Sequence, residues 1–264
     1  MHFDKDTMSI KKNTANDTLI DNFSLILTCT IAPKKNMPYL ARSSVKDRRD
    51  DYLYAFSKWL DNECIKNIIF IENSGSPIND FIILYKSHMR YKSINVEFLS
   101  ADLRNHPQRL GKGYGEQKCL KYILNKSKQI QKTRRFIKCT GRYYVTNASK
   151  ILKKFTLDTD CFCEVNKNLL WADSRFFGGS LEFIEIICKN GSEVDDSNGI
   201  YFEHILAKSF LMGISKRLKW QFIPYPLLID GISGTTGLRI TSSYIGYLKR
   251  TLRKRIYEFF FKHT

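Results

Sequence analysis

Two neighbouring segments of the sequence carry residue types that bind phosphate. The first, residues 111–116, has the sequence Gly-Lys-Gly-Tyr-Gly-Glu and precedes a helical pattern; we call it the glycine segment. Glycines let a backbone approach a ligand closely, and a helix start offers unpaired N–H groups and a positive dipole end. The second segment, residues 136–147, supplies Lys138 and Arg142. Together they predict a phosphate-binding site.

The elements that must position these residues alternate along the first half of the chain. Apolar runs rich in β-branched residues predict four strands, and apolar residues at helical spacing predict the helices between them. This order predicts an α/β fold with a Rossmann-type, mainly parallel sheet that helices cover on both faces. The predicted strands are residues 23–31, 65–71, 94–99 and 135–139, and the predicted helices are residues 50–59, 77–85 and 114–130.

Polar residues follow each predicted strand. Ligands of open parallel sheets bind at the carboxyl ends of the strands, so these residues are expected to gather on one edge. The candidate ligands of a phosphate-bearing substrate are Thr30, Glu72, Asn73, Ser74, Asp102, Lys112, Gly113, Tyr114, Lys138 and Arg142.

The second half of the chain supplies candidate acid–base groups. Asp173 and Arg175 lie on the same side of a predicted strand, residues 168–172 and their extension, and either hold substrate hydroxyls or pair with each other. Glu203 lies near the start of a predicted helix, residues 199–211, and is either a general base or an acid that complements the helix dipole. Without a repeat or a low-complexity linker, we expect one continuous unit with lobes at 23–147 and 148–244, after a polar segment at 1–22.

Composition indicates the class of partner. The formal net charge is +17, from 43 Lys+Arg against 26 Asp+Glu, which predicts an anionic partner: a nucleotide, a phospholipid surface or a nucleic acid. Seven cysteines, an odd number lying mostly in apolar runs, favour reduced and buried thiols. The Cys161-x-Cys163 pair lacks the second pair that a structural zinc site requires.

The two ends of the chain suggest where it acts. The polar start lacks the apolar core of a signal peptide, and no window is long and apolar enough to span a bilayer, so we expect a protein made in the cytosol. Residues 245–264 predict a basic amphipathic helix that either binds an anionic membrane or docks on the core. Its cations are Lys249, Arg250, Arg253, Lys254 and Arg255.

Residues 23–230 resemble bacterial glycosyltransferases of surface-polysaccharide and lipopolysaccharide assembly, which have a GT-A-like fold. The motifs that carry the resemblance are residues 70–75, 111–116, 138–143 with Asn147, and 171–175. It implies a nucleotide-sugar donor, with UDP as the expected carrier, bound by the candidate ligands named above. It also implies a lipopolysaccharide, capsule or lipid-linked glycan acceptor near Arg175 and Asn147, Glu203 or Asp173 as the catalytic group, and an enzyme peripheral on the inner face of the inner membrane.

The sequence departs from this family at the metal site. GT-A enzymes usually place Asp-x-Asp after the fourth strand, where this chain has Thr140-Gly141-Arg142. The resemblance therefore implies no required cofactor, with Lys138 and Arg142 neutralising the leaving diphosphate. The pair Asp158-x-Asp160 lies about 20 residues later and is expected to form a turn. A Mg²⁺ or Mn²⁺ site there stays open as the less favoured alternative.

The same positive net charge also fits a different class of function. The net charge and the many aromatic residues also suit a nucleic-acid-binding or nucleotide-processing protein. The chain has no helix-turn-helix, zinc-finger or RNA-binding signature and no Gly-x-x-x-x-Gly-Lys-Ser/Thr loop. We therefore expect a nucleotide sugar, a glycan or glycolipid and an anionic membrane surface as partners, and no nucleic acid.

Overall fold

The computed structural model describes residues 22–35, 37, 40–156, 158–240, 246–249, 251 and 252. The α-helices are α1 Val45–Asp61, α2 Asn79–Ser87, α3 Gly111–Lys126, α4 Lys128–Thr133, α5 Ala148–Leu152, α6 Leu181–Asn190 and α7 Phe202–Ser215. The strands are β1 Ser24–Cys29, β2 Asn67–Glu72, β3 Asn95–Ser100, β4 Arg135–Thr140, β5 Tyr143–Val145, β6 Cys161–Phe162, β7 Phe176–Ser180, β8 Trp220–Gln221 and β9 Ile229–Gly231. Short 3₁₀ turns cover Gln108–Leu110, Gly191–Glu193 and Asp196–Asn198.

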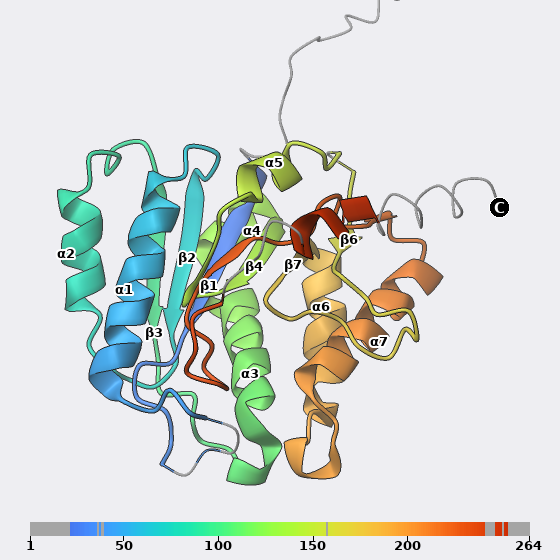
Figure 1. The fold of residues 1–264 in the computed structure, drawn as a ribbon, viewed down its shortest axis with the longest axis horizontal. Coiled ribbons are helices and arrows are strands. Elements are labelled where there is room, and N and C mark those ends of the chain that lie inside the picture. Colours follow the sequence, from blue (N-terminus) through green and yellow to red (C-terminus); the bar gives the residue numbers. More distant parts are fainter. Residues whose placement is uncertain are drawn as a thin grey trace, which may run out of the picture.

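Seven strands form one sheet in the order β3-β2-β1-β4-β7-β6-β8 (Figure 1). Strands β1 to β4 are parallel to one another, whereas β7 runs antiparallel to both β4 and β6. The predicted α/β class with a mainly parallel sheet is confirmed. Because β6, β7 and β8 extend the sheet of β1 to β4, the sheet itself crosses the predicted lobe boundary at residue 147. A separate two-stranded sheet pairs β5 with β9.

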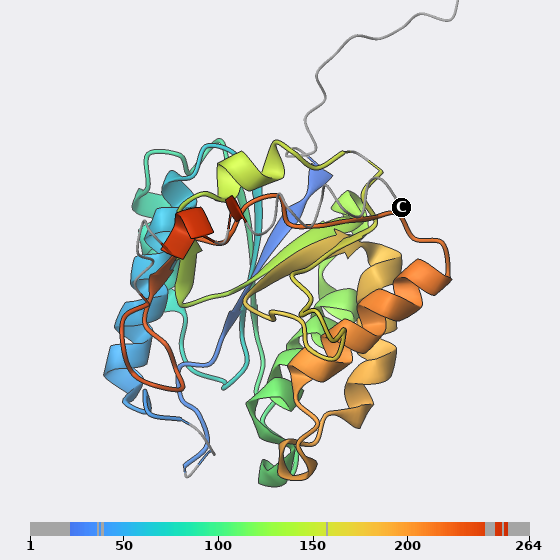
Figure 2. The ribbon, with the colours of Figure 1, turned by 45° about the vertical axis from the view of Figure 1, so that its right-hand side comes forward.

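The continuous apolar runs are explained by two separate cores. Along β1, Leu25 and Leu27 face a core shared with α1, α2 and α5, while Ile26 faces a core shared with α3, α4, α6 and α7. Side chains alternate along a strand, so a strand covered on both faces must be apolar at every position. Figure 2 shows α1 on one side of the sheet and α6 and α7 on the other.

The second half differs most from the predicted elements. No strand covers residues 168–172; they end a turn and make one isolated bridge, Val165 to Ala172. The strand instead comes after Asp173 and Arg175, where Gly178 lies inside β7 because a side chain there would meet Phe162 at 2.6 Å. The helix predicted at 114–130 is two helices, since Ser127 begins α4 by accepting a hydrogen bond from the Ile130 N–H.

The cysteines and the chain end are described in part. All seven cysteines are free thiols, and Cys29, Cys119, Cys139, Cys161 and Cys163 are buried, as predicted. Lys249 is exposed on a helical stretch, residues 246–249, and Leu252 is 62% exposed. Arg250, Arg253, Lys254 and Arg255 lie outside the described residues. No helix in the described ranges combines the length and apolar character needed to cross a bilayer.

Candidate functional site

The carboxyl ends of β1, β2 and β4 meet at one edge of the sheet, as predicted. The register pairs Thr28 with Thr140 and Cys29 with Glu72, so Thr30, Asn73 and Arg142 follow neighbouring strand ends. The Gly141 N–H donates to the Thr28 carbonyl at 3.0 Å. A side chain on Gly141 would lie 2.6 Å from that oxygen, so this close crossing requires glycine. The crossing carries Arg142 across the end of β1.

Arg142 is a buried cation with unused donors. Its side chain is 9% exposed and its guanidinium carbon lies 5.7 Å from the Tyr52 ring centroid and 5.9 Å from that of Tyr143. Among the described residues, neither Nε nor Nη1 of Arg142 has a hydrogen-bond partner. Leaving buried donors unpaired is unfavourable by about 1–3 kcal/mol each, and more for charged groups. The geometry therefore favours an anion as the missing partner.

Two further cations lie near Arg142; we call Arg48, Lys112 and Arg142 the cationic cluster. Arg48 donates to the Tyr52 hydroxyl at 3.1 Å and to the Thr30 carbonyl at 2.7 Å. The pKa of Lys112 is lowered by its burial and then by the positive charges of Arg142 and Arg48. Like charges held this close repel one another, so an anion bound among them would be stabilised by all three.

The cluster is covered by a loop from the far end of the chain, residues 233–237, which we call the 233–237 loop. The Gly234 carbonyl accepts hydrogen bonds from the Ala41 and Arg42 N–H groups, and Thr235 accepts one from the Lys112 ammonium at 3.1 Å. Figure 1 shows this loop running in front of the sheet between α1 and α3. A side chain on Gly234 would overlap the Arg142 guanidinium, so the backbone of this loop packs directly against that cation.

Carboxylates approach the cluster from the second half of the chain. Because β7 is antiparallel to β4, the residues before β7 return to the carboxyl edge, where the Thr140 N–H donates to the Arg175 carbonyl at 3.2 Å. Arg175 holds Asp173 through two donors, and Ser174 donates to Glu203 Oε1 at 2.7 Å. The edge thus gathers Asp173, Arg175 and Glu203, which the sequence predicted as site residues.

Asp196 is a site residue that sequence reasoning missed. It is half-buried beside Lys112 at the start of α3, and its Oδ1 has no hydrogen-bond partner among the described residues. Burial, and then repulsion by Glu203, raise the pKa of Asp196 to about 6. A polar turn, residues 195–199, was the sequence signal for a loop here, but no spacing pointed to this carboxylate. Arg48, Tyr52 and the 233–237 loop were also missed.

The glycine segment forms the first turn of α3 instead of a loop that precedes it. A side chain on Gly111 would overlap Asp196, and one on Gly113 would lie 2.7 Å from Phe202. These glycines therefore let the residues around α7 pack against α3. The helix start carries the Asp196 carboxylate where a phosphate was expected. Tyr114 packs against the His106 ring, with centroids 5.1 Å apart.

Lys138 lies beneath the edge and not on it. The side chain is fully buried, forms an ion pair with Glu116, and donates to Thr140 Oγ1 at 3.1 Å and to the Ser174 carbonyl at 2.7 Å. Burial lowers the pKa of Lys138 to about 8. Its contacts tie β4 to α3 and to the segment before β7, so the direct phosphate contact predicted for Lys138 does not fit this position.

Three predicted donor ligands hold the loop after β2. Glu72 is fully buried and accepts hydrogen bonds from the N–H groups of Ile31, Ser74 and Ser76. Asn73 donates to the Cys119 sulfur at 3.1 Å, while its Oδ1 is buried and unpartnered among the described residues. Ser74 accepts from the Ala32 N–H at 3.0 Å. Glu72 and Ser74 shape the edge, and Asn73 alone keeps an unused acceptor.

Two more predicted ligands are engaged by their neighbours. Asp102 is paired with Arg104, whose guanidinium holds the pKa of that carboxyl well below its usual range. The Asn147 amide donates to the Pro226 carbonyl at 2.9 Å and accepts from the Leu228 N–H at 3.0 Å. Asn147 therefore anchors the segment that leads into β9, with one amide hydrogen and one oxygen lone pair already used.

The Asp158-x-Asp160 pair lies at the opposite edge of the sheet. Asp158 pairs with Lys219, and Asp160 lies 3.8 Å from Arg135, the first residue of β4. Asp160 directly precedes β6, whose direction matches that of β4, so it cannot reach the carboxyl ends. Within the described ranges, no group of three His, Cys, Asp or Glu side chains is arranged to hold a metal ion.

Comparisons with known proteins found only weak similarities. No protein-family model matches the sequence, and no curated protein matches it. The glycosyltransferase GlyE of Streptococcus pneumoniae TIGR4 is 9% identical, with TM-score 0.43 over 76% of this chain and 44% of that chain. A cytidylyltransferase from Leptospira borgpetersenii is 10% identical, with TM-score 0.44 over 84% and 82%. The galactosyltransferase LgtC, in complex with donor and acceptor sugar analogs, is 11% identical, with TM-score 0.42 over 71% and 70%.

This chain thus spans less than half of the GlyE chain. Similarities of this size support no conclusion about activity, so the function has to be argued from the site itself.

Proposed function

We propose that this protein is a glycosyltransferase that moves a sugar from a nucleotide-sugar donor to a glycan acceptor. The observation that carries the proposal is Arg142, a buried guanidinium at the carboxyl edge of a mainly parallel sheet, whose Nε and Nη1 have no partner in the part of the chain that the structure describes. The diphosphate of a nucleotide sugar supplies several anionic oxygens, which are strong acceptors for the N–H donors of a guanidinium. Lys112 lies on the same side and adds a second positive charge.

In this proposal the cationic cluster replaces a metal ion. When the bond to the sugar breaks, negative charge develops on the departing nucleoside diphosphate, and Arg142 and Lys112 stabilise it electrostatically. Binding of the donor would then need no divalent cation. Mg²⁺ or Mn²⁺ remains the alternative, which the effect of a chelator distinguishes.

Glu203 is the residue that we propose as general base. Asp173 is held by both arms of Arg175, whereas Glu203 accepts a hydrogen bond from Ser174 at one oxygen. A carboxylate held at one oxygen can accept a proton from an acceptor hydroxyl at the other. Asp173 and Arg175 would position the acceptor. Asp196, which carries a proton below about pH 6, would sense the charge of the donor through Lys112.

The acceptor and the location are also proposals. We infer a lipopolysaccharide, capsule or lipid-linked glycan acceptor and a site of action at the inner face of a bacterial inner membrane. Leu248 and Leu252 are 47% and 62% exposed on one helical face beside exposed Lys249, which supports a helix that binds an anionic surface. Liposome flotation would test this: a chain that ends at residue 244 should lose binding to anionic vesicles, and equal flotation would refute the anchoring role.

Thermal shift with a panel of probes tests the central proposal. A ligand at 100 times its dissociation constant adds about 2.7 kcal/mol of stability. We expect UDP or CMP to raise the melting temperature in the presence of EDTA, and single-stranded oligonucleotides to have no such effect. Stabilisation by oligonucleotides alone would support the nucleic-acid alternative, and stabilisation by UDP only with Mg²⁺ or Mn²⁺ would refute the metal-free site.

A further inference from the structure

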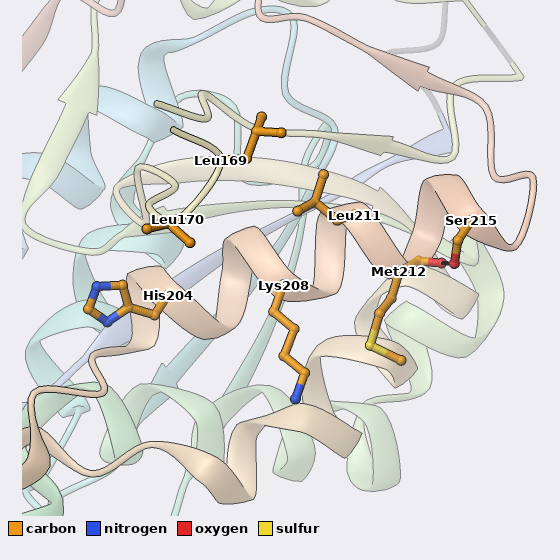
Figure 3. Close-up of a pocket in the computed structure, with 7 residues that line it drawn as sticks. All are labelled: Leu169, Leu170, His204, Lys208, Leu211, Met212 and Ser215. Atoms are coloured by element: carbon orange, nitrogen blue, oxygen red, sulfur yellow. Dashed lines mark hydrogen bonds between the residues drawn. The ribbon is translucent and has the colours of Figure 1, made fainter. Parts of the chain in front are cut away.

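A second feature lies on the outer side of α7, away from the cationic cluster. It is a groove of about 560 Å³ between α7 and the turn before β7; we call it the α7 groove. Figure 3 shows Leu169 and Leu170 of that turn above α7, and the other lining residues along the helix. This volume lies in the range of roughly 300–1,000 Å³ typical of small-molecule sites. The lining residues are Leu169, Leu170, His204, Lys208, Leu211, Met212 and Ser215.

The groove is long and mainly apolar. Its α7 residues lie on one stripe of the helix, from His204 to Ser215, and eleven residues at 1.5 Å each give a length of about 16 Å. Leu170 is 65% exposed, Leu169 51% and Leu211 37%. An apolar groove of this length fits a hydrocarbon chain better than a sugar, whose hydroxyls would find few polar partners here.

The backbone at Leu169 indicates that its side chain is retained for a reason. Leu169 has φ +61°, in the left-handed region where non-glycine residues are uncommon and where Asn is preferred. It ends a turn in which its N–H donates to the Asn166 carbonyl at 2.9 Å. A leucine in this conformation is unfavourable because its Cβ lies close to the following carbonyl oxygen, and exposing it to water adds no stability. The chain therefore keeps an apolar side chain over the groove against local preference.

One end of the groove adjoins the candidate catalytic residues. His204, which lines the groove, directly follows Glu203. The Trp171 ring lies 5.0 Å from the His204 ring, and the next residue, Ala172, donates its N–H to the Glu203 carbonyl at 3.0 Å. The groove thus begins at the end of α7 that carries Glu203, although the Glu203 carboxylate, bonded to Ser174, points from a different face of the helix.

The charges around the groove are mainly positive. Lys167 lies in the turn beside Leu169, and exposed Lys216 and Arg217 follow Ser215 at the other end. Lys208 is neutralised by Glu193, whose oxygens both lie 2.7 Å from its ammonium. Cations flanking an apolar slot complement a molecule with a hydrocarbon chain and an anionic group.

We propose that the α7 groove holds the hydrocarbon chain of an anionic, single-chain amphiphilic acceptor. This inference rests on the proposed function, because it specifies the acceptor class of the same enzyme. In this proposal the hydrocarbon chain in the groove belongs to the acceptor itself and not to bulk membrane lipid.

Dodecyl phosphate, used below its micelle concentration, is the probe that tests the groove. By isothermal titration we expect saturable binding of one molecule to the full chain, at least tenfold tighter than methyl phosphate. The double variant Leu169→Asn/Leu170→Asn should bind dodecyl phosphate at least tenfold more weakly. Asn suits the left-handed position, so this variant should keep or raise its melting temperature, and the loss cannot be attributed to misfolding.

Ile83→Asn is the matched control, since Ile83 is 64% exposed on α2, on the other side of the sheet. It should bind dodecyl phosphate like the wild type. Equal binding of methyl and dodecyl phosphate, unchanged binding by the double variant, or an equal loss in Ile83→Asn would each overturn the proposal. Preference for anionic vesicles over dodecyl phosphate, lost in the double variant, would assign the groove to membrane lipid and overturn it as well.

The groove and the donor site can fail separately. Stabilisation by UDP reports on Arg142 alone and should be unchanged in Leu169→Asn/Leu170→Asn. If dodecyl phosphate binds as expected while UDP does not, the groove stands as an amphiphile site and the proposed glycosyl transfer falls; the reverse result removes only the groove.

Discussion

The two segments that the sequence marks for phosphate have different surroundings in the fold. In the glycine segment, Gly111 and Gly113 face Asp196 and Phe202, and the start of α3 carries a carboxylate of the chain itself. At the end of β4, Arg142 keeps two donors unpaired among the described residues. Both segments contain glycine beside a cation, yet in the first the glycines admit other parts of the protein, and in the second Gly141 carries a cation to a buried position where two of its donors have no partner among the described residues.

The difference shows that a glycine-rich helix start does not by itself indicate a site for a bound anion. Backbone N–H groups at a helix start attract a phosphate or an acidic side chain equally well, and a carboxylate within the same chain has no entropy of association to overcome. Among the described residues, Nε and Nη1 of the buried Arg142 guanidinium have no such internal partner. The buried Arg142 guanidinium is therefore better evidence of a bound anion than the glycine segment is.

Replacing Arg142 should give the largest effect. We expect Arg142→Met to weaken UDP binding about 100-fold, because charge-assisted hydrogen bonds contribute about 1.5–3 kcal/mol. The melting temperature of the free protein should not fall, since the substitution removes unpaired buried donors. Isothermal titration with UDP and a thermal melt measure the two quantities.

Lys219→Met is the control for this variant, because Lys219 is an exposed cation at the opposite edge of the sheet. It removes the same charge and should leave UDP affinity unchanged. Unaltered UDP binding by Arg142→Met would remove the contrast between the two segments.

The glycines of α3 give the next largest effect, and it should be on stability. In Gly113→Ala the new methyl would lie 2.7 Å from Phe202, so α3 and α7 must move apart, with an expected loss of about 2 kcal/mol. In Gly115→Ala the nearest atoms are at 3.8 and 3.9 Å, and alanine should stabilise the helix by about 0.5–1 kcal/mol. Chemical denaturation measures both, and weaker UDP binding by the stable Gly115→Ala would restore a phosphate-binding role for the segment.

Gly234→Ala should weaken UDP binding while leaving the unfolding free energy nearly unchanged. Its methyl would overlap the Arg142 guanidinium, the flexible end of a long side chain, so the fold can adapt while the cation moves. We expect UDP binding to weaken about tenfold, or about 1.4 kcal/mol, with a change in unfolding free energy below about 0.5 kcal/mol. An equal loss in stability and affinity would mean that the 233–237 loop itself had unfolded.

Asp196→Asn should give the smallest effect, and one that depends on pH. The folded state raises the pKa of Asp196 from 3.8 to about 6, so folding favours the protonated carboxyl. The contribution of the protonated Asp196 carboxyl to the unfolding free energy is fully present below pH 3.8 and is lost as pH rises toward 6. After allowance for partial exposure, Asp196→Asn should be more stable than wild type by about 1 kcal/mol at pH 7.5 and equal to it near pH 3.5. Denaturation at the two pH values tests this, and a difference that does not change with pH would contradict the pKa.

The sheet was predictable because its signal is local. The runs at β1, β2 and β4 are mostly apolar, without polar–apolar alternation, as expected of strands covered on both faces, and helical spacing between them implied parallel order. The gathering of Thr30, Asn73 and Arg142 then followed from the direction of the strands. The strand at Phe176–Ser180 was missed because its two glycines favoured a turn, and only the close approach of the neighbouring residues Phe136, Asp160 and Phe162 explains them.

The partners of the site residues were not predictable, because they come from distant parts of the chain. No local pattern pairs Asp196 with the start of α3, or shows that Asn147 is engaged by the segment at 226–228. Glu72 was expected at the edge and is there, yet its burial depends on the fold of residues 31–76 as a whole. Sequence reasoning located the edge, and three-dimensional contacts decide which of its side chains remain available.

The return of the 233–237 loop to Arg142 bears on how the protein is made. Gly234 follows Arg142 by roughly 90 residues, and at synthesis rates of about 5–20 residues per second that interval takes several seconds. The seven-stranded sheet needs nothing beyond Gln221, so a ribosome-bound chain can complete its sheet before its anion site exists. Nascent protein would remain unable to capture nucleotide until its last part emerges.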